Sequence, residues 1–117
     1  MRISKRKINN ALEKELYSTL YQVIADLKTT QEAETVLKDL LKPNELITVV
    51  KRLSIAYWLT KGRGVSNIRD NLAVSPATIE SIKHGLPKSK GANLAIKKIE
   101  AEEWANKWAG RIKKLVK

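Results

Sequence analysis

The chain has no cysteine, no phenylalanine and a single histidine among its 117 residues. Without cysteine, a disulfide framework and a zinc–thiolate site are both excluded. The sequence also lacks an HExxH motif and a glycine-rich phosphate loop, and its carboxylates are scattered over outward helix faces without a convergent pair. We therefore expect no enzyme, no metal site and no cofactor.

Long apolar runs are missing too, so we expect no membrane-spanning segment. The first residues, MRISKRKINN, are basic but are not followed by an apolar segment, so we expect no secretory signal and a cytoplasmic protein. Acidic residues are scarce, with 12 Asp and Glu against 23 Lys and Arg, which gives a formal net charge of +11. Such an excess favours a polyanionic partner, and we expect that partner to be double-stranded DNA.

Strand-like alternation is nowhere sustained, whereas apolar residues recur every third or fourth position almost throughout. This period predicts an all-α protein. By length the chain is one domain with a modest core. We expect helices over residues 7–28, from Thr29 to about 41, from Lys42 or Asn44 to about 61, and from about Ala92 to Leu115.

Two of these helices have conspicuous apolar faces. The helix over 7–28 has one long stripe, and because so small a protein offers few partners for it, we expect the stripe to be shared with a second copy in a homodimer. Its residues are Ile8, Leu12, Leu16, Leu20, Val23, Ile24 and Leu27. For the helix that follows Pro43 we expect the inner residues Leu46, Val49, Val50, Leu53, Ala56, Tyr57 and Leu59.

The segment 65–85, VSNIRDNLAVSPATIESIKHG, contains two short helical patterns joined by only two residues. Ser75 is a strong helix cap, and Pro76 suits a first-turn position because no N–H donor is needed there. Helices joined this tightly must cross steeply, which brings Ile68 and Leu72 onto the apolar residues of the second helix. The segment is therefore predicted to be a helix-turn-helix, although its corner holds Ala73 where many such motifs have glycine.

The outward face of the second helix has small or polar side chains that suit a major groove. We expect base contacts from Pro76, Ala77, Glu80, Ser81 and His84. Glu80 can accept a hydrogen bond from cytosine, although it can equally be a solvated charge or a partner of His84. We expect phosphate contacts from residues that flank the two helices, namely Arg63, Ser66, Arg69, Ser75, Lys83, Lys88 and Lys90.

After this motif comes a basic connector, in which Gly85, Pro87 and Gly91 are expected to interrupt any helix. From residue 87 to 117 there are nine Lys or Arg against three Glu. Trp104 and Trp108 lie four residues apart on one face of the last helix. We favour their packing on the dimer over a ligand cage or a platform for base stacking.

From residue 41 onward the order of these signals resembles the tryptophan repressor family. The resemblance covers about residues 12–86 and is found in LKPNE at 41–45, KRLSIAYWLTKG at 51–62 and IRDNLAVSPATI at 68–79. It implies a six-helix all-α fold, an intertwined homodimer and two helix-turn-helix heads in successive major grooves. On this basis we expect a dimerisation and DNA-binding domain over 1–86, followed by a connector and an extra C-terminal helix over 87–117.

The resemblance also implies an effector pocket, because the arginine and threonine that contact the family's tryptophan match Arg52 and Thr78. Other positions depart from the family's pattern: the second ligand arginine is Ser81, the glycine beside it is Ile82, and the threonine before the proline is Lys42. Isoleucine fills space that glycine leaves open, and the partner of the ligand carboxylate is missing. We therefore do not expect tryptophan as corepressor.

The leading hypothesis is a sequence-specific transcriptional regulator, a repressor that occupies a near-palindromic operator. An alternative is the DNA-binding component of a mobile-element or recombination system, or a non-specific architectural protein; near-equal affinity for all duplexes would favour it. A helical interaction module is a third possibility, and failure to bind any nucleic acid at low salt would indicate it.

Overall fold

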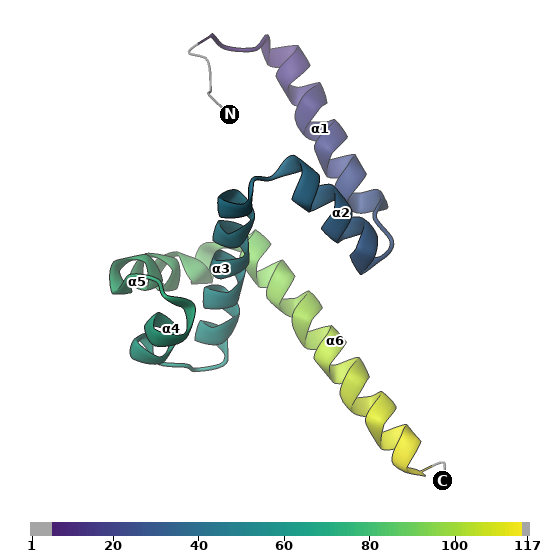
Figure 1. The fold of residues 1–117 in the computed structure, drawn as a ribbon, viewed down its shortest axis with the longest axis vertical. Coiled ribbons are helices and arrows are strands. Elements are labelled where there is room, and N and C mark those ends of the chain that lie inside the picture. The colour runs from purple at the N-terminus through teal and green to yellow at the C-terminus, as the bar shows by residue number, and fades with distance from the viewer. Residues whose placement is uncertain (1–5, 116–117) are drawn as a thin grey trace. The chain divides into compact units, whose positions relative to one another are not determined.

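The structure, a computed structural model, describes residues 6–115 (Figure 1). These residues form α-helices and one short 3₁₀ helix without any strand, which confirms the all-α prediction. The chain divides into two units, Met1–Leu46 and Ile47–Lys117. The elements are α1 (Asn10–Asp26), α2 (Thr30–Leu40), α3 (Pro43–Thr60), α4 (Val65–Leu72), α5 (Pro76–Gly85), η1 (Leu86–Lys88) and α6 (Lys90–Leu115).

The ends of the first helices are set by side chains that cap free backbone groups. Asn9 accepts hydrogen bonds from the N–H groups of Ala11 and Leu12, and Leu27 is extended, so α1 is shorter at both ends than the predicted span 7–28. Thr29 caps α2 as predicted, accepting from the N–H of Glu32 at 3.1 Å.

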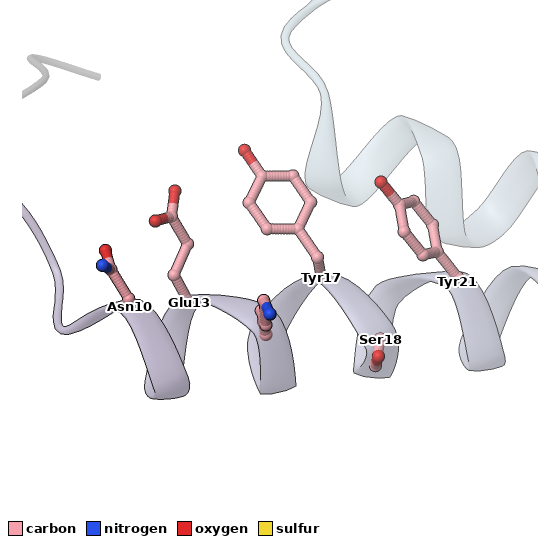
Figure 2. A pocket seen from close by; sticks show the side chains of 6 residues that line it. Asn10, Glu13, Tyr17, Ser18 and Tyr21 are labelled. Atoms are coloured by element: carbon pink, nitrogen blue, oxygen red, sulfur yellow. The ribbon is translucent and has the colours of Figure 1, made fainter.

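In the first unit, the apolar stripe of α1 is open. Leu12, Leu16 and Leu20 remain 47%, 51% and 42% exposed, and no residue of α1 or α2 is fully buried. Tyr17 and Tyr21 lie side by side along α1 with their ring centroids 6.1 Å apart, while Ser18 lies on a different side of the helix (Figure 2). The hollow drawn in Figure 2 is lined by one helix alone and is a shallow surface feature.

The second unit has a small core at the centre of the helix-turn-helix. Ile55 of α3, Ile68 of α4 and Ile79 of α5 are fully buried against one another. The predicted packing of Ile68 and Leu72 on the second helix is confirmed. Around the three isoleucines pack Leu72, Val74, Ile82, Trp58, Leu59 and Val65. Burying three isoleucines contributes roughly 1.5–3 kcal/mol each, so this core holds α4 and α5 on α3.

The predicted inner face of α3 was wrong in part. Ala56 is buried, but Ile55 is the central core residue, whereas Val49, Val50 and Leu53 are 52%, 46% and 39% exposed. Since α3 has apolar residues on nearly every side, the period alone could not identify the side that meets α4 and α5.

The connector after α5 is more regular than expected. Gly85 still belongs to α5, Leu86–Lys88 form η1, and α6 begins at Lys90, so Gly91 lies inside the first turn of a helix that it was expected to interrupt. The side-chain amide of Asn93 donates to the carbonyl oxygens of Leu86 and Ser89, both at 2.9 Å. These two hydrogen bonds hold the turn between η1 and α6.

Candidate nucleic-acid interface

The two helices of the motif are joined by a tight corner. Helix α4 ends at Leu72, and Ala73 adopts a left-handed conformation with φ 52° and ψ 52°. This conformation costs an alanine about 1–2 kcal/mol, and it explains why glycine is common at such corners. The ammonium of Lys51 on α3 donates to the Ala73 carbonyl oxygen at 3.4 Å, a contact that sequence reasoning missed.

Helix α5 begins at the predicted position. The Ser75 hydroxyl accepts a hydrogen bond from the N–H of Thr78 at 3.2 Å, and Pro76 occupies the first turn. Ile79 and Ile82 anchor the inner side of α5. The residues predicted to contact bases, Pro76, Ala77, Glu80, Ser81 and His84, are all exposed, and at 100° per residue they fall on one arc opposite that anchor.

At the start of α4, two predicted phosphate contacts flank an open helix end. Gly64 is the N-cap residue of α4, and none of the described side chains caps the first turn of this helix. The N–H groups of that turn can therefore donate hydrogen bonds to oxygen acceptors. Arg63 lies over the Trp58 ring, 3.9 Å from its centroid, and also donates to Asn67. Ser66 is exposed beside it.

The other predicted phosphate contacts are exposed as well, but they differ in their neighbours. Arg69 forms an ion pair with Asp70 at 2.9 Å, so a phosphate would have to compete with that carboxylate. Lys83 lies in the last turn of α5, Lys88 in η1 and Lys90 at the first position of α6. Because Asn93 fixes the turn around these last two lysines, their ammonium groups project from an ordered segment.

The predicted effector residues, Arg52 and Thr78, line one hollow between α3 and α5. Its volume is about 450 Å³, and its other lining residues are Ala77, Ser81 and Ile82. Among the described residues that line it, Arg52 is the only cation, and Ile82 packs partly against the core. The hollow therefore lacks a second guanidinium for a carboxylate ligand, as the sequence indicated.

Other kinds of site find little support in the part of the chain that the structure describes. Residues 6–115 contain no group of three His, Cys, Asp or Glu side chains placed to hold a metal ion. Within the same residues, no helix is both long enough and apolar enough to cross a bilayer. The exposed face of α5 and the cations around it remain the candidate site.

Comparison with protein families supports this reading of the fold. The family described as Trp repressor protein matches residues 15–98, well over half of the chain, and this range contains the helix-turn-helix and the helices before it. Neither a curated protein nor a solved structure matches the chain. The matched family consists of DNA-binding regulators and not of enzymes. The chain belongs to the Trp repressor protein family.

Proposed function

We propose that this protein is a sequence-specific transcriptional repressor that occupies a near-palindromic operator through its helix-turn-helix. The observation that carries the proposal is the arrangement of α5. Ile79 is fully buried and fixes the helix, while the small and polar side chains opposite it stay exposed. A helix held in this way can enter a major groove without first having to order itself.

Sequence choice and general affinity come from different residues in this proposal. Glu80 accepts from a cytosine amino group, Ala77 contacts a thymine methyl group, and His84 can donate or accept. The cations around α4, η1 and the start of α6 neutralise phosphates and position the protein. We keep Arg69 as a phosphate contact, but as a weaker one, because Asp70 already pairs with it.

The operator is near-palindromic because the protein binds as a homodimer. The exposed stripe of α1 and the exposed residues Val49, Val50 and Leu53 of α3 offer apolar surface that a second copy would cover. Two-fold symmetry places the two α5 helices in half-sites about one helical turn apart. The domain of residues 1–86 supplies both dimerisation and DNA binding, and residues 87–117 add basic surface.

Tryptophan is not the corepressor in this proposal. The hollow beside Arg52 and Thr78 contains Ser81 where the family places a second arginine and Ile82 where it places glycine. DNA binding is therefore expected in the absence of tryptophan. Equilibrium dialysis with labelled tryptophan, with and without operator DNA, tests this; saturable binding that raises DNA affinity would contradict it.

Selection of randomised duplex DNA on the purified protein at near-physiological salt tests the function. We expect enrichment of a palindrome with half-sites about a turn apart. The matched variants are Ser81→Glu, on the exposed face of α5, and Ser18→Glu, on the polar side of α1. The new carboxylate on α5 should lower the affinity for the selected duplex about tenfold or more, while the one on α1 should not.

A flat selection would overturn the proposal. If binding appeared only at lowered salt and was equal for all duplexes, the protein would be a non-specific architectural binder. If no nucleic acid bound at low salt, the helices would form an interaction module for another protein. Equal losses from the Ser81 and Ser18 variants would show that α5 is not the reading helix.

A further inference from the structure

The second half of α6 extends past the last contact with the rest of its unit. The Tyr57 hydroxyl donates to the Glu103 carboxylate, and the Lys61 ammonium lies 3.5 Å from it. From there α6 continues to Leu115 (Figure 1). Every residue from 101 to 111 is exposed. An isolated helix of about 12–15 residues or fewer is marginal in water, and Gly110 weakens this one further. The segment therefore requires a partner.

Helix α6 has apolar residues on two opposite faces. One face is turned towards the rest of the unit and contains Ala92, Ile96 and Ile99; Ile96 is buried, with 3% exposure. Roughly half a turn away lies a second face with Ala101, Trp104, Ala105 and Trp108. Trp104 and Trp108 are 63% and 44% exposed, with their ring centroids 5.6 Å apart. We call this second face, residues 101, 104, 105 and 108, the tryptophan face.

The charges along this half of α6 are separated by sign. Glu100, Glu102 and Glu103 come first, and Lys107, Arg111 and Lys113 follow. Glu100 and Arg111 lie on the same flank of the tryptophan face, three turns apart, which is too far for an ion pair within one helix. Neither forms an ion pair with any other residue in the described range; Arg111 only lies near the Trp108 ring.

We propose that the tryptophan face of α6 packs antiparallel against the same face of a second copy of this chain. The two-fold axis crosses the helix pair at the height of Asn106. In that register Trp104 of each copy meets Trp108 of the other, and Glu100 lies within one residue of Arg111 from the other copy. Residues on the same flank face each other in an antiparallel pair, so both ion pairs form at once. A self-complementary patch of this kind is what a two-fold interface requires.

The charge pattern distinguishes this occupant from others. A parallel pair would place glutamates against glutamates and cations against cations, which is unfavourable. A polyanion such as duplex DNA or an anionic membrane would meet the acidic stretch at residues 100–103 together with the tryptophans. The segment also lies beyond the residues matched to the family, 15–98, so the pairing adds to the surfaces of the family domain and does not depend on DNA binding.

Single cysteines test the geometry, because the chain has no cysteine of its own. Ala105 lies next to the proposed axis, whereas Ala101 lies about 15 Å from its counterpart along the helix axis, beyond the reach of a disulfide. Under oxidising conditions at high micromolar protein, we expect Ala105→Cys to form a covalent dimer and Ala101→Cys to remain uncrosslinked. Failure of Ala105→Cys to cross-link, or equal cross-linking of both variants, would overturn the proposal.

Charge reversal gives an independent test by light scattering. In a Leu16→Glu background, where the proposed α1 interface is removed, Glu100→Arg and Arg111→Glu should each shift self-association to at least severalfold higher concentration, and the variant with both charge changes should restore it. The controls Glu102→Arg and Lys113→Glu make the same changes on the far side of α6 and should have no such effect. If the variant with both charge changes self-associated no more tightly than the variants with one, the antiparallel pair would be wrong. The same would follow if the fluorescence of the tryptophans changed only when duplex DNA or anionic vesicles were added.

Discussion

Single residues of α5 and η1 are expected to divide the work of DNA binding. Glu80→Ala should change the preferred bases with a modest loss of affinity, because it removes one acceptor from the exposed face. Lys88→Ala should weaken binding to all duplexes and reduce the salt dependence by about one unit of slope for each phosphate contact that is lost. Binding titrations over a series of salt concentrations measure both effects.

Separate roles for Glu80 and Lys88 would be refuted if the two substitutions lowered the affinity equally for all DNA sequences. A useful additional control is Lys38→Ala on α2, since that lysine is an exposed cation that pairs with Glu34 and lies on no predicted contact surface. It should leave both site preference and salt dependence unchanged.

Replacing the corner residue Ala73 by glycine is expected to stabilise the protein, although the same substitution inside a helix is destabilising. The φ of Ala73, 52°, lies in a region that costs an alanine about 1–2 kcal/mol, while glycine adds about 0.4–1 kcal/mol of unfolded-state entropy. Ala73→Gly should therefore stabilise the protein by roughly 0.5–1 kcal/mol. Chemical denaturation measures this change.

The matched control for this prediction is Ala77→Gly, the same substitution at a helical position of α5, which should destabilise the fold. Loss of stability in both variants would mean that the corner is not strained in solution.

At the scale of elements, α4 and α5 depend on three buried isoleucines. Ile68→Ala would leave a cavity at the point where α3, α4 and α5 meet, so it should cost about 2–5 kcal/mol. Leu94→Ala removes as large an aliphatic side chain from an exposed position, 59% accessible, and should change stability by about 0.5 kcal/mol or less. Thermal unfolding followed by circular dichroism measures both. Equal effects would show that this core does not hold the motif together.

Element starts were predictable where one or two neighbouring residues decide them. Thr29 with Glu32, and Ser75 with Pro76, satisfy free N–H groups within a single turn, so their sequence signal does not depend on the rest of the fold. The helix-turn-helix and the outward arc of α5 followed from the same local signals.

Features that depend on distant contacts were not predictable. Ile55 became the centre of the core only because α4 and α5 pack on that side of a helix that is apolar nearly all round. Gly91 is tolerated in the first turn of α6, where Asn93 reaches back seven residues to the Leu86 carbonyl. The contact of Arg63 with Trp58 depends on the left-handed turn at Gly62, where φ is 85°. The helix end near residue 61 was predicted from the sequence, but the contact between Arg63 and Trp58 was not.

At the scale of the whole molecule, the proposed homodimer makes DNA binding depend on α1. Leu16→Glu places a charge in the exposed apolar stripe, so it should lower the dimer fraction and weaken binding to a palindromic site by at least about tenfold. Ser18→Glu adds the same charge to the polar side of α1 and should leave the mass unchanged. Sedimentation equilibrium and titration with operator DNA measure the two effects, both in a Glu100→Arg background that removes the proposed α6 pair. In that background an unchanged mass for Leu16→Glu would exclude the stripe as the dimer interface.

The contact between Arg63 and Trp58 has a consequence for optical measurements. The guanidinium lies 3.9 Å from the centre of the indole ring, directly before the open N-terminus of α4. A phosphate that draws Arg63 away would change the surroundings of the indole and therefore its emission. With Trp104 and Trp108 replaced by tyrosine, the remaining indole would give an unlabelled fluorescence signal for the arrival of the DNA backbone, on the time scale of stopped flow.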